Sequence, residues 1–198
     1  MKRLDILIAG VGGQGVVLAS DIVGEAALAA GYDIKKTDTL GMAQRGGSVI
    51  SHVRIGQRVW SPLIKEGEVD IIVAFEKLEA ARWSHYLRPG AIAIVNNQVV
   101  PPLSVNLGNE RYPSDEEIIN ILRQWTDRIY FVDGTSRVRE LGNIRTLNIF
   151  MLGCVSFFLP LKVHIWKNTI FQHLPSKIQQ INITAFDQGR KEIRNVHL

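Results

Sequence analysis

The chain has 198 residues, of which 46% are hydrophobic and 21% are charged, so its size and composition fit one globular domain with a sizeable core. A formal net charge of +4 is too small to indicate a nucleic-acid partner. The most basic cluster, Arg190, Lys191 and Arg194, has the spacing of a solvated face on a terminal helix.

The longest apolar run spans residues 149–161, which is shorter than the about 20 residues needed to cross a bilayer. It predicts a buried helix. The first residues are charged but lead into no signal-peptide-like apolar region. We therefore expect a cytoplasmic protein with no membrane partner.

The chain contains one cysteine, Cys154, which lies inside that apolar run. A single cysteine cannot form an intramolecular disulfide or supply the four thiolates that an iron–sulfur cluster normally needs. Its apolar neighbours predict a buried structural thiol. The sequence also lacks H-E-x-x-H, G-x-S-x-G and P-loop motifs, so it assigns no catalytic residue and no metal ligand.

The N-terminal half of the chain alternates strand and helix signals. An apolar strand is followed by a glycine-rich turn, a helix of apolar residues at helical spacing, and a second strand, which together make a βαβ unit. A hairpin is then predicted around Gly56 and Gln57. The expected strands are residues 4–9, 32–37, 49–55 and 58–60, and the expected helix is 16–30.

The second half continues this alternation. Residues 70–75, 91–95 and 129–132 predict buried strands, and residues 76–87 predict a helix. Ser114 and Glu117 form a capping box that starts another helix, with Ile118, Ile121, Leu122 and Trp125 on one face. The remainder is mainly helical. We therefore predict a single Rossmann-like α/β domain with an open, mostly parallel sheet and helices on both faces.

A glycine loop, Gly10-Val11-Gly12-Gly13-Gln14-Gly15, fits G-x-G-x-x-G and stands between the first strand and the first helix. In a dinucleotide site the first glycine allows a tight turn, the second lets a ligand approach, and the third lets the helix pack closely. The helix N-terminus that follows favours an anion. Such a site also needs an acidic residue about 20 positions further on, and neither Asp33 nor Asp38 is clearly placed at a strand end. The alternative is a tight turn without a ligand.

A second glycine-rich loop contains Arg45, Gly46, Gly47 and Ser48. The Arg45 guanidinium suits a carboxylate or a phosphate, although a solvated surface loop is the alternative interpretation. Both loops follow strands, so we expect them at one edge of the sheet, in a concave patch of N–H groups that prefers an anion. Acidic groups of a partner are the favoured anions, followed by coenzyme A.

These motifs resemble the gamma domain of 2-oxoacid:ferredoxin oxidoreductases. The likeness includes both glycine loops and, in order, Val53-Arg54-Ile55, Ser61-Pro62, Glu68-Val69-Asp70 and the closing segment 182–189. Within that family, Tyr112-Pro113 and the run 151–160 look most similar to the small beta subunit of indolepyruvate oxidoreductase.

The resemblance implies an accessory subunit of an enzyme that oxidatively decarboxylates a 2-oxoacid to an acyl-coenzyme A. It implies thiamine diphosphate and [4Fe-4S] clusters on a larger partner subunit, coenzyme A as co-substrate, and ferredoxin as the electron acceptor of the complex. Residues 99–103, which are apolar and irregular, are candidates for the partner contact.

Two other functions stay open at the level of sequence. A stand-alone dinucleotide-dependent dehydrogenase would bind NAD(P) or FAD and would use Asp33 or Asp38. A regulatory nucleotide-binding module would be a stable monomer with a ligand at the glycine loop.

Overall fold

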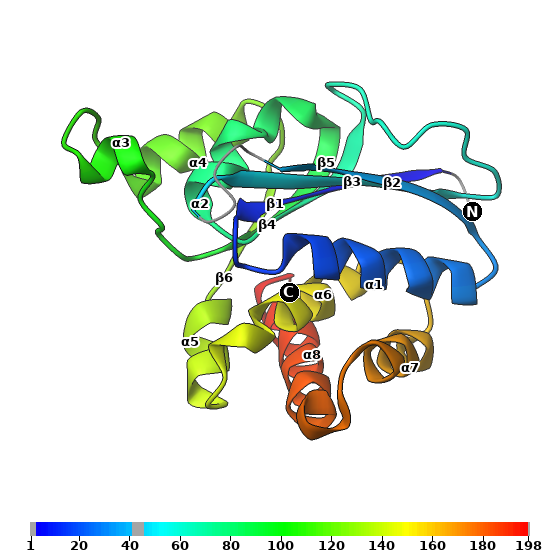
Figure 1. Ribbon diagram of the computed structural model, residues 1–198. Coiled ribbons are helices and arrows are strands. Elements are labelled where there is room, and N and C mark those ends of the chain that lie inside the picture. Colours follow the sequence, from blue (N-terminus) through cyan, green and yellow to red (C-terminus); the bar gives the residue numbers. More distant parts are fainter. Residues whose placement is uncertain (1–2, 41–45, 198) are drawn as a thin grey trace.

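The computed structural model describes residues 3–40 and 46–197, in which one six-stranded sheet lies between helices (Figure 1). The strand order is β2-β3-β1-β4-β5-β6. β1, β4, β5 and β6 pair in parallel, whereas β3 is antiparallel to both β1 and β2. The strands are β1 (Leu4–Val11), β2 (Asp33–Leu40), β3 (Ser48–Gly56), β4 (Val69–Ala74), β5 (Leu87–Asn96) and β6 (Arg128–Val132).

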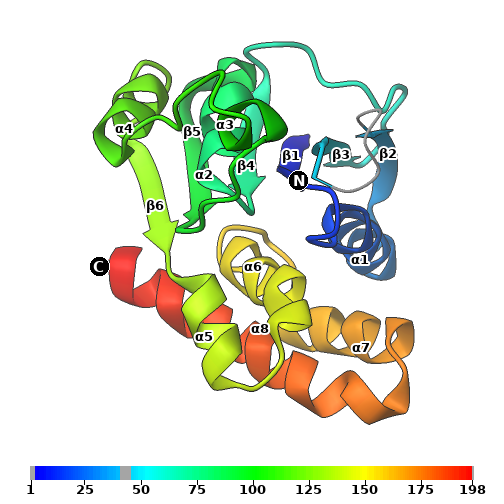
Figure 2. The same cartoon turned by 60° about the vertical axis from the view of Figure 1, so that its left-hand side comes forward.

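Helices cover both faces of this sheet, as Figure 2 shows. Alternate residues of β1 point to opposite faces, so Ile6 and Ile8 join one apolar cluster while Leu7 and Ala9 join the other. The two clusters are therefore the two sides of one sheet, and the predicted single-domain, mostly parallel α/β fold is confirmed.

The first cluster packs against α1 (Val16–Ala29), α5 (Gly134–Glu140), α6 (Leu147–Ser156), α7 (Val163–His173) and α8 (Ser176–His197). The second packs against α2 (Lys77–Arg82) and α4 (Asp115–Arg123). The short elements are α3 (Leu103–Asn106), η1 (Ser84–Tyr86) and η2 (Ile144–Thr146).

The centre of the helical layer is the crossing of α6 and α8. All ten residues of α6 are buried, so the apolar run forms the predicted core helix. A Cβ atom on Gly153 would lie 2.2 Å from the carbonyl oxygen of Phe186, and one on Gly189 would lie 2.0 Å from that of Phe150. The two helices therefore touch through their backbones. Cys154 lies at this crossing and its thiol donates to the Gly189 carbonyl (3.3 Å); burial raises the pKa of that thiol.

The predicted hairpin at Gly56 and Gln57 is wrong. Residues 58–60 form no strand, and β3 pairs instead with β1 and β2, which both precede it in the chain. The two strands of the predicted βαβ unit, β1 and β2, are therefore not neighbours in the sheet, because β3 lies between them. The apolar residues of β3 satisfy either pairing, so the strand pattern did not reveal which neighbour the strand would take.

Smaller differences occur at element ends. The helix predicted over residues 76–87 ends as α2 at Arg82 and is followed by η1, while β5 already begins at Leu87. The Ser114–Glu117 capping box is present, and Ile118 and Leu122 are buried, but Trp125 lies beyond α4 and is 38% exposed.

The basic cluster on α8 is not uniformly solvated. Lys191 and Arg194 are exposed, whereas Arg190 is half-buried and donates to the Ser156 hydroxyl (2.8 Å). No helix in the described part of the chain combines the length and the apolar character needed to span a membrane.

The α6–α8 crossing predicts a large stability loss for Gly153→Ala. The added methyl group would meet backbone atoms of α8, which cannot move away as a flexible side chain could, so the helices must separate. We expect the free energy of unfolding to fall by about 3 kcal/mol or more, measured by denaturant unfolding followed by circular dichroism.

Gly24→Ala is the matched control, because Gly24 is also a helical glycine. Its new Cβ would meet only the terminal Cδ1 of Ile34, which can rotate away. The change should therefore stay within about 1 kcal/mol, with the gain in helix propensity opposing the crowding. Equal losses in the two variants would contradict the backbone-contact interpretation.

Candidate functional site

The two glycine-rich loops meet at the carboxyl end of β1. The Gly12 N–H donates to the Gly47 carbonyl (2.8 Å), and the Gly46 N–H donates back to the Gly12 carbonyl (3.4 Å). In the sheet, Val11 pairs with Ser48. The loops therefore lie side by side, as predicted, at the end of the sheet where β1 terminates. They meet there because β3 starts where β1 ends.

The roles predicted for three glycines change in the structure. Gly10 is part of β1 and makes no tight turn; a Cβ there would lie 2.8 Å from Oε1 of Gln14. Gly12 uses its N–H on the second loop rather than leaving it to a ligand. Gly15 is the N-cap of α1 with a φ of 83°, and it packs against Asn148 of α6 rather than against the sheet.

The second loop contributes less to an anion patch than predicted. Arg45 lies outside the described residues. The Ser48 hydroxyl bonds to the buried Glu79 carboxylate and accepts from the Trp83 indole N–H (3.1 Å), so it points toward α2. Gly46 and Gly47 contribute their backbones, which bond to Gly12.

Gln14 joins the ends of the central strands. Its Oε1 accepts from the Val11 N–H (2.8 Å), and its Nε2 donates to the Phe75 carbonyl (3.3 Å) and to Oε1 of Gln98 (3.4 Å). Asn96 Nδ2 also donates to the Phe75 carbonyl (3.1 Å), and Thr135 Oγ1 donates to Gln98 Oε1 (3.0 Å). A neutral amide network therefore connects the carboxyl ends of β1, β4 and β5, at the end of the sheet where ligands of open α/β sheets usually bind.

Beside this network the structure has a cavity of about 380 Å³. One wall is the glycine loop and the other is the start of α6. The lining residues are Gly13, Gln14, Gly15, Gln98, Ile144, Arg145, Leu147 and Asn148. Of the predicted site residues, the fold thus brings Gly13, Gln14 and Gly15 to the cavity wall, whereas Gly10, Gly12, Gly46, Gly47 and Ser48 do not line it.

Two polar side chains of this cavity were missed by the sequence analysis. Asn148 is only 4% exposed, and its Oδ1 accepts from the Ile149 N–H (2.9 Å), while its Nδ2 has no hydrogen-bond partner among the described residues. Arg145 is exposed, and within the same residues its guanidinium pairs with no carboxylate. In the sequence, Asn148 directly precedes the apolar run 149–161 and Arg145 lies three positions earlier, which gave no reason to place them near residue 15.

The electrostatics of this cavity favour an anion. The N–H groups in the first turn of α1 have no intrahelical partners, and the helix carries a partial positive charge at that end. Arg145 adds a full positive charge, and the largely buried Asn148 adds an amide donor. The cavity can therefore bind a phosphate or a carboxylate, and the apolar side chains of Ile144 and Leu147 can contact a larger attached group.

Asp33 and Asp38 do not form the ribose-binding acid of a dinucleotide site. Asp33 begins β2, at the opposite edge of the sheet, and accepts from the Val59 N–H (2.7 Å), which lowers the pKa of its carboxyl. Asp38 is bound by the Ser51 hydroxyl (2.6 Å) and Lys36 (3.0 Å). Since β3 separates β2 from β1, Asp38 is also about 5 Å further from the glycine loop than in an uninterrupted βαβ unit. These contacts argue against the stand-alone dehydrogenase.

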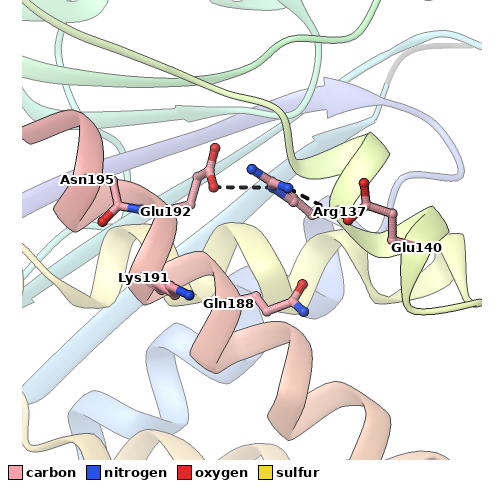
Figure 3. Close-up of a pocket in the computed structure, with 6 residues that line it drawn as sticks. All are labelled: Arg137, Glu140, Gln188, Lys191, Glu192 and Asn195. Atoms are coloured by element: carbon pink, nitrogen blue, oxygen red, sulfur yellow. Dashed lines mark ion pairs between the residues drawn. The ribbon is translucent and has the colours of Figure 1, made fainter.

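A second, smaller cavity of about 210 Å³ lies between α5 and α8 (Figure 3). Arg137 pairs there with Glu192 (3.4 Å) and Glu140 (3.7 Å). Together with Lys191, the cavity is lined by two positive and two negative side chains. Gln188 Oε1 is buried there without a partner among the described residues. This arrangement ties α5 to α8 and, unlike the first cavity, presents no net charge to a ligand.

The structure thus defines a Rossmann-like α/β protein in which a glycine loop lies beside a cavity, and in which neither Asp33 nor Asp38 takes the position of a ribose-binding acid. The profile of the pyruvate ferredoxin/flavodoxin oxidoreductase family matches residues 5–192, and the chain belongs to this family. The resemblance inferred from the sequence is therefore confirmed.

Individual relatives agree. The chain is 37% identical to the indolepyruvate oxidoreductase subunit IorB of Pyrococcus horikoshii, covering 99% of this chain and 98% of that protein. It is 26% identical to the common gamma subunit of the pyruvate/ketoisovalerate oxidoreductases of Pyrococcus furiosus, covering 77% and 76%.

Two solved structures share the fold. The keto/oxoacid ferredoxin oxidoreductase gamma subunit of Geobacter sulfurreducens has a TM-score of 0.72 and 20% identity, covering 97% of this chain and 99% of that one. The 2-oxoglutarate:ferredoxin oxidoreductase of Magnetococcus marinus has a TM-score of 0.75 and 19% identity, covering 98% of this chain but 32% of that longer one.

The amide network predicts that Gln14→Glu destabilises the protein although the two side chains have the same shape. A carboxylate can still accept from Val11, but it cannot donate to Phe75 or Gln98, whose oxygens then face it without a proton. We expect a loss of about 1–3 kcal/mol in the free energy of unfolding at neutral pH. Gln180→Glu, at an exposed position of α8, should change it by less than about 0.5 kcal/mol. The network has no such role if both variants unfold at the same denaturant concentration.

Proposed function

We propose that the chain is the accessory, gamma-type subunit of a 2-oxoacid:ferredoxin oxidoreductase whose substrate is indolepyruvate or another arylpyruvate. Family membership supports the reaction class. The chain is similar to IorB over nearly the full length of both proteins, which supports an aromatic substrate. Its similarity to the gamma subunits of pyruvate/ketoisovalerate oxidoreductases, which would support a smaller substrate, is lower and covers less of each chain.

The redox cofactors belong, in this proposal, to a larger partner subunit. The described residues contain no group of three or more His, Cys, Asp or Glu side chains that could hold a metal. The one cysteine in the sequence is buried at the α6–α8 crossing, so the donors do not fit a [4Fe-4S] cluster. Thiamine diphosphate and the clusters would therefore be on the partner, and ferredoxin would accept electrons from the complex.

The cavity at the glycine loop is the proposed contribution of this chain to binding. The α1 N-terminus, Arg145 and the Asn148 amide, which has no partner among the described residues, converge on one open cavity, which suits a phosphate of coenzyme A. An acidic side chain of the partner is the other candidate anion. We favour coenzyme A because these donors line a cavity, into which part of a small molecule can enter. A carboxylate of a partner subunit could be bound by donors on an exposed surface.

The segment around α3 is the proposed contact with the larger subunit. Val99, Leu103 and Leu107 are 45%, 71% and 65% exposed. The segment is anchored to α2, because the Tyr112 hydroxyl donates to the buried Glu76 carboxylate and the Val100 N–H donates to the same group (3.1 Å). α3 lies at the outer end of the molecule in Figure 1. Large apolar side chains held on a rigid base suit an obligate interface.

The subunit assignment predicts that the native chain co-purifies with a larger protein that contains thiamine diphosphate and iron–sulfur clusters. Leu103→Glu should weaken this complex at least tenfold, because it places a charge in an apolar contact, whereas Leu28→Glu, at a 55% exposed position of α1, should not. Affinity is measured by titrating the labelled chain with the purified partner. Recovery of the chain with no such partner, together with turnover by the chain itself, would overturn the assignment.

The coenzyme A site predicts a selective kinetic effect of Arg145→Ala in the reconstituted complex. A charge-assisted hydrogen bond contributes about 1.5–3 kcal/mol, so the KM for coenzyme A should rise about tenfold or more while the KM for the 2-oxoacid stays unchanged. Arg139→Ala, on the exposed side of α5, is the matched control. Arg45→Ala, which the sequence singled out, is measured in the same assay. Unchanged coenzyme A kinetics in Arg145→Ala would remove the cavity from the proposal.

A further inference from the structure

The outer edge of β2 is open. β2 is the terminal strand of the sheet and pairs with β3 on one side, while no strand in the described part of the chain pairs with its other side (Figure 2). It is eight residues long, longer than β6 at the opposite edge, which has five. Long unpaired edges invite a further strand, and proteins usually shorten them or cover them.

The side chains of β2 alternate between two environments. Lys35 and Thr39 are exposed and Thr37 is half-buried on the face away from α1. Lys36 and Asp38 point to the α1 face, where Lys36 Nζ lies 3.0 Å from Asp38 Oδ2 and also pairs with Asp21. This face of β2 therefore carries one positive and one negative charge, two positions apart. Asp33 and Lys35 repeat that spacing on the other face, where they lie 3.7 Å from each other.

We infer that two copies of this chain associate by antiparallel pairing of β2 with β2 of the second copy, about a two-fold axis at Thr37. In this register Lys36 lies opposite Asp38 of the second copy, on both sides of the axis, and Thr37 lies opposite Thr37. Opposite charges and paired threonines are favourable cross-strand neighbours. The sheet then continues from one copy into the other.

The neighbouring registers are excluded by charge. Shifting each strand so that the axis passes through Lys36 places two lysines opposite each other, and an axis at Asp38 places two carboxylates opposite each other. Like charges directly opposite are destabilising. An axis that passes midway between two adjacent residues would put side chains from different faces opposite each other, which sheet geometry does not permit about a two-fold axis perpendicular to the sheet. An axis at Ile34 would also place Asp33 opposite Lys35, but it overlaps β2 only over residues 33–35, whereas the axis at Thr37 pairs residues 34–40. Complementary charge and extensive overlap therefore coincide in the register about Thr37, which indicates a second copy rather than an unrelated strand.

Cysteine cross-linking tests this register, and the chain is well suited to it because its one native cysteine, Cys154, is fully buried. In the Thr37→Cys variant the two new thiols lie on Cβ atoms about 5 Å apart. In Thr39→Cys, at a more exposed position of the same face, they are about 14 Å apart, four residues along the strand. Thr37→Cys should therefore form a covalent dimer with a short bis-maleimide, and Thr39→Cys should form at least tenfold less.

The oligomeric state gives an independent measurement. Light scattering on the full-length chain should give twice the 22.2 kDa chain mass. Thr37→Lys, which places two lysines opposite each other, should raise the dimer dissociation constant at least tenfold, whereas Gln180→Lys on α8 should not. A monomeric wild-type chain, equal cross-linking of both cysteine variants, or a Thr37→Lys protein that dimerises like wild type would each overturn the inference.

Discussion

The backbone contact between α6 and α8 is the constraint on which the helical layer and the site depend. Gly153 and Gly189 leave no room for a Cβ atom, so each helix packs directly on the other's carbonyl groups. α6 is thereby fixed under the sheet, and its first residues are fixed against Gly15. The contact between the two helices therefore also places Asn148 and Arg145 beside the glycine loop, in the wall of the cavity.

The antiparallel strand β3 determines how the two loops and Asp38 are placed. By lying between β1 and β2, it brings Gly46 and Gly47 onto Gly12, so that the two loops bond to each other. It also moves Asp38 away from the glycine loop, where a dinucleotide-binding protein needs its acid. One inserted strand thus separates the glycine loop from the acid that a dinucleotide site requires and leaves β2 as the terminal strand of the sheet.

The site itself combines neutral and charged parts in separate places. Gln14, Asn96 and Gln98 satisfy one another and the strand ends without any formal charge. Arg145 and the Asn148 amide, whose donors have no partner within residues 3–40 and 46–197, line the cavity beside them. A polar network that is satisfied stabilises the fold, whereas donors without partners are available to a ligand. In the proposed function, these donors bind one anionic group and the amide network beside them stabilises the fold.

The sequence by itself determined the elements whose signals are local: the apolar strands, the capping box at Ser114, the buried helix before Leu161 and the glycine turn before α1. Each depends on periodicity or on neighbouring residues. Only the tertiary structure decided the pairing of β3, the folding of Gln14 over Gly10, and the meeting of Gly15 with Asn148, which is 133 positions further along the chain. These contacts depend on how packed layers bring distant segments together, and a strand pattern with period two is equally compatible with either neighbour.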